Sequence, residues 1–233
     1  MSDLTTVQPL HRVNVLDHGH VELVDSMGND LSVVRAAQAS FNRASDMYGE
    51  REAGILRFLM REQHGVPFEH VVFTFRLRLP VFVARQLVKH RMSSWSEHSA
   101  RYSELEPEFY LPQVFRSQTG KPGAYTFSEA GAFTQTVGTA AMREACHTAW
   151  AQYRRMIECG VAKEQARLVL PVNIYTSATW TLNARSLLNM AHLRSDAHAQ
   201  HETRVYSDAM VELARTVVPD TIAAWDEFGR SAI

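Results

Sequence analysis

The sequence of 233 residues has little of several features that define whole classes of protein. It holds two cysteines, Cys146 and Cys159, whose spacing fits no metal-binding pattern, so neither a disulfide framework nor a cysteine-based zinc site is expected. No apolar run is long enough to span a bilayer. Met1 to Val15 has neither the basic start nor the apolar core of a signal peptide. We therefore expect a protein of the reducing cytoplasm without membrane partners.

Net charge is also nearly absent, because 24 Lys and Arg residues face 25 Asp and Glu residues, for a formal charge of −1. No bulk field would attract nucleic acid or an anionic membrane. Lysine is scarce and occurs at positions 89, 121 and 163, so that arginine supplies most cations. This bias fits anion recognition, but a compositional bias of the source genome explains it as well and is the reading we favour.

The glycine-rich motifs of nucleotide-binding domains are missing, so any dinucleotide would be held without a Rossmann domain. Apolar periodicity predicts strands and helices along the whole chain. The strands are Arg12–Leu16, His20–Met27, Val71–Leu79 and a β-rich stretch Val172–Thr181. The helices are Leu31–Ala39, Glu50–Gln63, one from Pro80, one within Ser128–Gly160, Lys163–Leu170, Asn183–Leu193, His198–Val217 and Pro219–Phe228. We predict a single α+β domain over residues 1–233, with a central, mostly antiparallel sheet and long helices.

Local signals mark the ends of several elements. Asp30 is the expected cap of the first helix, and Gly65 is expected to end the second. Pro80 should open the helix that follows the Val71–Leu79 strand. Phe115–Phe127 is rich in Gly, Pro, Ser and Thr, which predicts a mobile surface loop.

The densest polar segment of the chain follows the helix that starts at Pro80. Arg85, Lys89, His90 and Arg91 are expected on its last turns. The next residues read as extended chain, in which Glu97, Ser99 and Arg101 would lie on one side. A carboxylate, a hydroxyl and a guanidinium in a row suit a small anionic ligand such as a phosphate. An ordinary solvated loop, with cations favoured by the helix dipole, explains the spacing about equally well.

Two further constellations carry candidate site residues. Arg185 and Asn189 are four positions apart and should share a face at the start of a helix, where free N–H groups can bind phosphate. Simple capping by Asn183 is the alternative, and the spacing alone favours it over a phosphate site. His198 and His201, with His192 nearby in sequence, would place two imidazoles at i and i+3 of a helix, which keeps a metal site open as a rival interpretation.

These segments resemble the flavin-dependent thymidylate synthases over almost the entire chain. That family carries Arg-His-Arg, two free positions, Ser, one free position, Asn-Glu, one free position, Ser, one free position and Arg-Tyr. The matching residues are His90, Arg91, Ser94, Glu97, Ser99, Arg101 and Tyr102. Lys89 and Ser96 depart from the usual Arg and Asn. The His64–His70, Ala166–Pro171, Asn183–Asn189 and Leu193–Gln200 segments resemble other parts of the family's pattern, with Val66 in place of a frequent Thr.

The resemblance implies reductive methylation of dUMP to dTMP, with methylenetetrahydrofolate as carbon donor, NADPH as reductant and FAD as the hydride carrier. It assigns Arg194 the catalytic role of stabilising negative charge on the uracil. The residues it assigns to dUMP are Gln86, Leu87, Val88, Lys89, Glu97, His98, Ser99, Ala100, Arg101, Arg167 and Arg194. The residues it assigns to FAD are Ser40, His64, Lys89, His90, Arg91, Glu97, Asn183, Ala184, Arg185, Asn189 and His198. No metal is implied.

The resemblance also implies a homotetramer whose sites form between subunits. Two alternatives from other classes remain at this stage. One is a nucleotide- or RNA-binding module without catalysis, against which the missing basic charge argues. The other is a metal-dependent hydrolase that uses His198 and His201.

Overall fold

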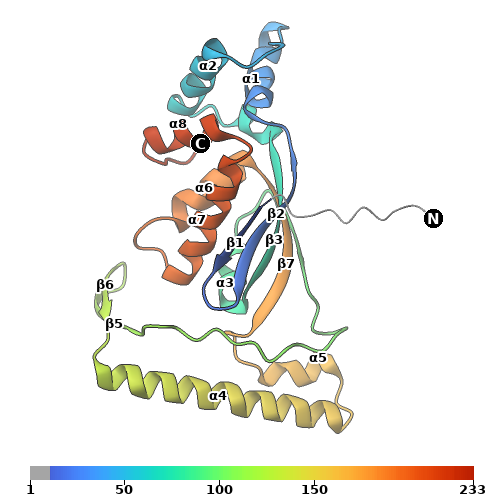
Figure 1. Ribbon diagram of the computed structural model, residues 1–233, viewed down its shortest axis with the longest axis vertical. Helices are drawn as coiled ribbons and strands as arrows, with labels where there is room; N and C mark the ends of the chain where they lie inside the picture. Colours follow the sequence, from blue (N-terminus) through green and yellow to red (C-terminus); the bar gives the residue numbers. More distant parts are fainter. Residues whose placement is uncertain (1–10) are drawn as a thin grey trace, which may run out of the picture. The chain divides into compact units, whose positions relative to one another are not determined.

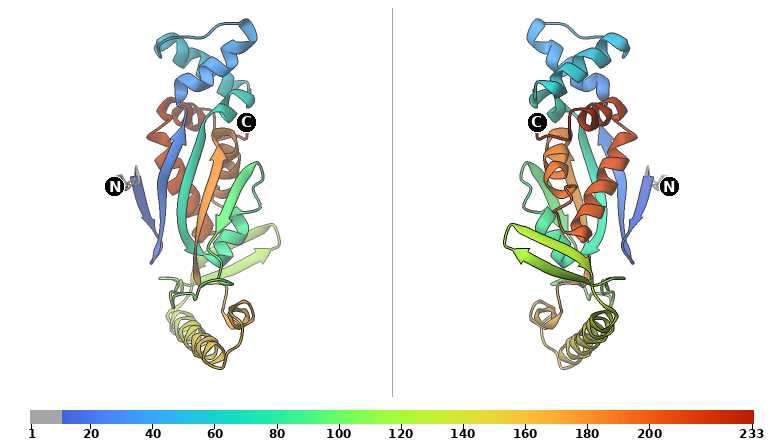
Figure 2. Two further views of the ribbon diagram at one scale, coloured as in Figure 1. Left: turned by 90° about the vertical axis from the view of Figure 1, so that its right-hand side faces the viewer. Right: turned by 90° about the vertical axis from the view of Figure 1, so that its left-hand side faces the viewer.

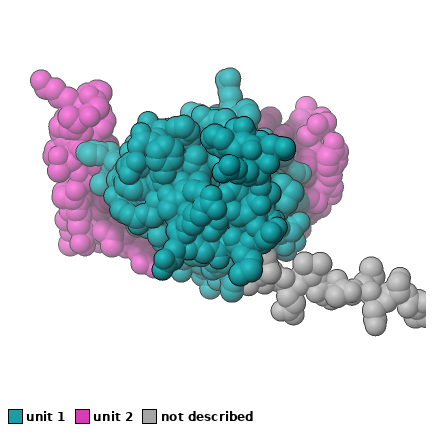
Figure 3. Space-filling model, turned by 90° about the horizontal axis from the view of Figure 1, so that it is seen from above, with its two compact units in different colours: residues 1–98, 176–233 teal, residues 99–175 magenta. Residues whose placement is uncertain are grey.

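A computed structural model describes residues 11–233 of the chain. Residues 1–10 lie outside the described residues, and so does most of the Met1 to Val15 stretch for which no signal peptide was predicted. The chain divides into two compact units, which Figure 3 colours separately. The first contains the chain up to His98 and again Thr176–Ile233, and the second contains Ser99–Tyr175. That a single domain spans residues 1–233 stays a prediction.

A five-stranded sheet organises the first unit (Figure 1). Its spatial order is β1 (His11–Val15), β2 (Gly19–Met27), β3 (Val72–Pro80), β7 (Tyr175–Asn183) and β4 (Ser93–Glu97). The β1–β2, β2–β3 and β4–β7 pairings are antiparallel, which confirms the predicted kind of sheet. Strands far apart in the sequence, β3 and β7, are therefore neighbours at its centre.

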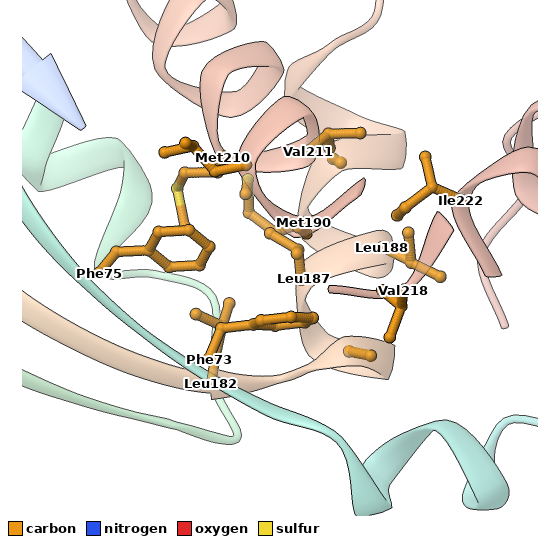
Figure 4. Packing of buried hydrophobic residues seen from close by; sticks show 14 of the residues in the cluster. Phe73, Phe75, Leu182, Leu187, Leu188, Met190, Met210, Val211, Val218 and Ile222 are labelled. Atoms are coloured by element: carbon orange, nitrogen blue, oxygen red, sulfur yellow. The ribbon is translucent and has the colours of Figure 1, made fainter. Parts of the chain in front are cut away.

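The alternation predicted for the strand after residue 70 is confirmed in β3. Phe73, Phe75, Leu77 and Leu79 have no exposed surface, whereas Arg76 on the opposite face is exposed. Side chains alternate across a strand, so one face of β3 can be wholly apolar. Figure 4 shows Phe73 and Phe75 packed among helical residues such as Leu187 and Met210. Burial of such a side chain contributes roughly 1.5–3 kcal/mol relative to exposure.

Helices α6 and α7 lie against one face of the sheet, as the two views of Figure 2 show. The helices of this unit are α1 (Asp30–Gln38), α2 (Glu50–Arg61), α3 (Val81–Leu87), α6 (Ala184–Arg194), α7 (His201–Arg215) and α8 (Pro219–Glu227). Two short 3-10 turns, η1 (Ala39–Phe41) and η2 (Val66–His70), join them. The arrangement is α+β, as predicted, with Pro80 preceding the first residue of α3.

The prediction that Asp30 caps the first helix is wrong. Asn29 is the cap: its side chain accepts a hydrogen bond from Ser32 N, and Ser32 Oγ accepts one from Asn29 N. Asp30 is buried and serves a different helix, because its carboxylate accepts hydrogen bonds from Asp220 N, Thr221 N and Thr221 Oγ1 at the start of α8. It therefore satisfies free N–H groups of a helix 190 positions further along the chain.

Gly65 does not end α2, contrary to prediction. The helix ends at Arg61, and Gln63 takes the left-handed conformation, with φ of 58°. His64 N then donates to Leu59 O at 2.9 Å and closes the helix end. Gly65 itself has right-handed φ and ψ angles of −70° and −31°, so its role lies in close packing and not in the turn.

The second unit contains a hairpin and a long helix. Its elements are β5 (Arg116–Lys121), β6 (Ala124–Glu129), α4 (Ala132–Glu158), α5 (Lys163–Ala166) and the turn η3 (Arg167–Val169). The loop predicted at Phe115–Phe127 is wrong, since β5 and β6 pair in antiparallel register. Pro122 and Gly123, with φ of 85° at the glycine, supply the tight turn between them. Few apolar side chains alternate there, so the composition concealed the strands.

Trp150 and Tyr153 of α4 form the centre of the second unit's apolar contacts. Trp150 meets Phe109 edge-on, with ring centroids 6.5 Å apart, and lies 5.1 Å from the ring of Tyr153. Beside them, Asn173 Nδ2 donates to Tyr110 O and contacts the buried Cys146 Sγ. In the chain from residue 11 onward, no helix has both the length and the apolar character needed to cross a membrane.

Candidate functional site

The polar segment after α3 lies outside the helix on which it was predicted. Helix α3 ends at Leu87, and Lys89, His90 and Arg91 follow it in a short connection to β4. Met92 has φ of 62° and reverses the chain there. Arg85 lies on the last turn of α3, as predicted, but the other three basic residues, which were predicted there too, follow the end of the helix. The segment is thus a tight corner between a helix and an edge strand.

Glu97 ends β4 with both carboxylate oxygens held in place. Trp95 Nε1 donates to Oε2 at 3.1 Å, and Thr176 Oγ1 donates to Oε1 at 3.0 Å. His98 continues the pairing for one more residue, because its N–H donates to Ser177 O. Two donors from different strands fix the orientation of this acceptor.

Strand alternation does not extend beyond Glu97, so the prediction that Glu97, Ser99 and Arg101 share one side of an extended chain is wrong. Ser99–Ser103 is a turn of the second unit, in which Tyr102 N donates to Ser99 O. Within that unit Arg101 and Arg167, both predicted for dUMP, converge on Glu164. Arg101 Nε lies 3.2 Å from the Glu164 carboxylate, and Arg167 Nε donates to its carbonyl oxygen at 3.4 Å. Ala100 is buried in the same turn.

The start of α6 brings together the residues expected to share a helical face. Asn183 caps the helix by accepting a hydrogen bond from Ser186 N at 2.8 Å, which confirms the capping alternative. Arg185 Nε donates to Ile233 O at 2.8 Å, and the Asn189 side chain exchanges two hydrogen bonds with the main chain of the same residue. Arg185 and Asn189 therefore do lie on one face, as predicted, and Ala184 beside them is buried.

A glycine permits this close packing. A Cβ atom added to Gly65 would lie 2.5 Å from Arg185 Nε and 2.9 Å from the carbonyl carbon of Ile233. Either distance is shorter than van der Waals contact, so any larger residue would displace the guanidinium. Gly65 therefore contributes to the site by packing against Arg185 and Ile233, although its predicted role at the end of α2 was wrong.

A cavity of about 720 Å³ opens beside this packing in the first unit. Its wall is mainly apolar, with Ile55, Phe58 and Pro67 among its residues, and it includes two predicted FAD residues, Ser40 and His64. Arg43 and Arg51 add positive charge to the wall. This volume is typical of small-molecule sites, and an apolar wall with a few cations fits a flat aromatic ligand that carries negative charge. The residues present therefore fit a flavin nucleotide.

His90 and Arg194 meet although they are 104 positions apart in the sequence. Arg194 Nε donates to His90 Nε2 at 2.9 Å, from the last turn of α6 to the corner after α3. Burial lowers the pKa of His90 below its usual value, and the positive charge of Arg194 lowers it further. The imidazole is therefore neutral at pH 7, and it holds the one side chain to which the resemblance gives a catalytic role.

The histidines of the rival metal site do not have the helical spacing that was predicted. Helix α7 begins at His201, so His198 lies in the preceding turn, where its side chain is 88% exposed and contacts Asp196 at 2.9 Å. Among residues 11–233, no group of three or more His, Cys, Asp or Glu side chains could hold a metal ion. A hydrogen bond of 2.6 Å joins Gln86, predicted for dUMP, to Gln200 in the same turn.

The remaining residues predicted for dUMP differ in how exposed their side chains are. Leu87 is fully buried in the core and cannot contact a ligand by its side chain, whereas Val88 and Lys89 follow it toward the corner with exposed surface. Sequence reasoning missed Glu69 and Ile233 as partners of Arg185, and Glu164 as the partner of Arg101. Glu69 was within reach, since it lies in the segment matched to the family, but no local pattern marks the other two.

Comparisons with known proteins agree on one family. A family model described as "Thymidylate synthase complementing protein" matches residues 22–220. A protein named flavin-dependent thymidylate synthase from Thermotoga neapolitana is 42% identical over 220 residues, covering 93% of this chain and 95% of the relative. One of the same name from Thermus thermophilus is 40% identical over 215 residues, covering 92% and 78%. The crystal structure of a UMP/dUMP methylase PolB from Streptomyces cacaoi, bound with 5-Br dUMP, is similar with a TM-score of 0.86 and 36% identity, covering 95% of this chain and all of that one.

Proposed function

The chain belongs to the flavin-dependent thymidylate synthase family, and from this premise we propose that it methylates dUMP at C5 to give dTMP. The carbon donor is methylenetetrahydrofolate, the reductant is NADPH, and tetrahydrofolate is released. The observation that carries the proposal is the contact between His90 and Arg194. It joins the two segments that resemble the family's signature regions, which supports a site that uses residues of both.

FAD would be held by groups of the first unit. The cavity that contains Ser40 and His64 offers an apolar wall with cations, and Arg185 and Asn189 are held rigidly at the start of α6. Bound FAD supplies the hydride transfer that no side chain can perform. The proposed FAD residues are Ser40, His64, Lys89, His90, Arg91, Glu97, Asn183, Ala184, Arg185, Asn189 and His198.

The nucleotide substrate needs cations for its phosphate and a fixed positive charge at its base. Ser99 and Arg101, with Gln86, would bind the phosphate, because a guanidinium grips phosphate oxygens through two parallel hydrogen bonds. Arg167 and Arg194 would face the uracil. Arg194 stabilises the negative charge that develops on the ring as C5 becomes nucleophilic, and it does so most in the transition state. The further dUMP residues proposed are Leu87, by its main chain, with Val88, Lys89, Glu97, His98 and Ala100.

Neither cysteine has a part in this reaction. Cys146 is buried against Asn173 in the second unit, where no substrate carbon could reach its sulfur. Cys159 is exposed and lies at the C-terminal end of α4, in the second unit. Methylation without a cysteine nucleophile fits the flavin-dependent chemistry.

The proposal extends to assembly and location. We propose a homotetramer in the cytoplasm, with sites shared between subunits, as the family resemblance implies. The net charge of −1 supports small-molecule partners over nucleic acid. Size-exclusion chromatography with light scattering tests the assembly: a mass four times 26.4 kDa is expected, and a monomer at assay concentration that remains active would refute it.

The decisive experiment measures flavin and product together. We expect the purified protein to be yellow, or to take up FAD on mixing, without stoichiometric metal. With methylenetetrahydrofolate and NADPH it should convert dUMP to dTMP, and omission of either co-substrate should stop product formation. A colourless protein that ignores FAD and holds zinc would contradict the proposal.

UMP should be assayed in parallel with dUMP, because the solved methylase at 35–36% identity is named for both nucleotides. Relatives at 36–42% identity are named thymidylate synthases, and on that balance we expect dUMP to be preferred. The measurement is kcat/KM for each nucleotide under the same conditions. A higher value for UMP would reassign the substrate while leaving the methyl transfer intact.

A further inference from the structure

We propose that His90 is the positioning residue of Arg194: its imidazole accepts the Arg194 Nε–H and fixes the plane of the guanidinium against the uracil. The proposal rests on the proposed function and deepens it, because it gives His90 a role toward Arg194 in addition to flavin binding. The distance of 2.9 Å between Arg194 Nε and His90 Nε2 is the geometric basis.

The geometry of this contact leaves the reactive end of Arg194 available. A guanidinium is planar, with Nε on one side and two Nη groups on the other. Within residues 11–233, Nε binds His90 while neither Nη group makes a hydrogen bond. Anchoring at Nε therefore fixes the direction of both Nη groups without occupying them. A bound pyrimidine can accept hydrogen bonds from both.

The chemical nature of the anchor also matters. A carboxylate is the alternative acceptor for an arginine, and the half-buried Arg185 is held in this way by Glu69. A carboxylate would cancel much of the positive charge that the transition state needs, whereas a neutral imidazole accepts the hydrogen bond and leaves that charge intact. His90 thus combines a fixed orientation with an undiminished field at the uracil ring.

The contact defines the tautomer of His90. Since Nε2 accepts, the ring proton must lie on Nδ1 in the neutral form. Protonation of Nε2 would remove the acceptor and place a second positive charge beside the guanidinium. Burial first, and then Arg194, lower the pKa of His90 below 6.5, and no other charged group within residues 11–233 shifts it. The anchor is therefore intact above this pKa and is lost as the pH falls through it.

Three substitutions at position 90 separate geometry from charge, with FAD and dUMP saturating and flavin absorbance measured for each. His90→Ala removes the acceptor and should lower kcat about tenfold, equivalent to about 1.4 kcal/mol. His90→Gln places an oxygen near the Nε2 position and should restore most of that loss. His90→Glu keeps an acceptor but adds a negative charge, and it should lower kcat at least as much as the alanine. Equal kcat for all three and the wild type would overturn the proposal.

A double-mutant cycle tests whether His90 acts through Arg194. If it does, His90→Ala should have almost no further effect on kcat in an Arg194→Ala background, because the group it positions is gone. If His90 instead acts only on the flavin, its loss should lower kcat by the same factor in both backgrounds. The second outcome would overturn the proposal.

The pH profile and the tautomer give two independent readouts. The wild type should lose kcat on an acid limb below pH 6.5, and this limb should weaken or vanish in His90→Gln. Nitrogen NMR of histidine-labelled wild-type protein should show an Nδ1–H tautomer at His90 that changes in Arg194→Ala. A profile unaffected by His90→Gln, or an Nε2–H tautomer in the wild type, would refute the contact. The NMR measurement on the wild type needs neither turnover nor a folded variant, so it tests the contact in every case. A wild-type protein that makes no dTMP would refute the proposed function and not the contact.

Discussion

Arg185 and Glu69 form an ion pair in which Nη1 and Oε1 lie 2.6 Å apart, and the same guanidinium donates from Nε to Ile233 O. Glu69 belongs to η2, which follows α2, and Arg185 opens α6. Two directions of Arg185 are thus fixed by protein groups before any ligand binds. A guanidinium held in this way pays little further conformational entropy when it contacts an anion.

The first prediction concerns this ion pair. Glu69→Gln keeps a hydrogen-bond acceptor but removes the charge, so Arg185 should be less firmly held. Because both side chains are about one third exposed, we expect only a threefold to fivefold rise in the FAD dissociation constant, about 1 kcal/mol or less. Flavin fluorescence titration measures it. Glu62→Gln, which breaks the exposed pair with Arg61, is the matched control and should leave FAD binding unchanged.

The second prediction concerns Arg194. Arg194→Ala should lower dTMP formation at saturating dUMP by on the order of 100- to 1000-fold, about 3–4 kcal/mol, as the loss of one preorganised donor typically does. Fold and flavin content should be retained, by circular dichroism and absorbance. Arg154→Ala, at an exposed pair in α4, is the control and should be near normal. A near-normal rate in Arg194→Ala would remove this residue from the catalytic role.

The third prediction concerns the cysteines. The double variant Cys146→Ala, Cys159→Ala should keep most of its turnover on dUMP, measured as NADPH oxidation coupled to dTMP formation. Cys146 is buried beside Asn173, so a modest loss of thermal stability is expected there and not at exposed Cys159. An inactive double variant that remains folded would show that the mechanism needs a thiolate.

The fourth prediction concerns Lys89, which stands where the family usually has arginine. If it meets a phosphate, its ammonium acts as a point charge and cannot form the planar two-bond contact of arginine. Lys89→Arg should therefore tighten FAD binding or leave it unchanged in the fluorescence titration. A marked loss of affinity would show that the ammonium has a specific role of its own. Lys121→Arg, in the exposed hairpin, is the control.

The fifth prediction concerns stability. Asp30→Ala should lower the free energy of unfolding by about 2–4 kcal/mol, because it leaves donors of Asp220 and Thr221 without their acceptor. Denaturant unfolding followed by circular dichroism measures the loss. Asp25→Ala, an exposed aspartate on β2, should change stability by much less. Comparable losses in both variants would contradict the buried cap.

Short-range patterns in the sequence predicted much of the fold correctly. The β3 strand was recognisable because its alternation reports one buried face, and α6 was recognisable because Asn183 is a strong capping residue. The errors have two causes. Asp30 and Gly65 were interpreted from neighbours in sequence, whereas the groups they contact lie far along the chain, at the start of α8 and at Arg185. The 115–127 hairpin pairs with itself, but few apolar side chains alternate in it to indicate strands.

The sequence by itself determined the family, the α+β class and the identity of most candidate site residues, because a long motif of mixed polar residues rarely arises by chance. Only the tertiary structure decided which residues touch. The sheet order places β7 between β3 and β4, which brings α6 beside the corner after α3, and so Arg194 reaches His90. Packing of an apolar core selects that order from contacts between distant segments, and no local pattern encodes them.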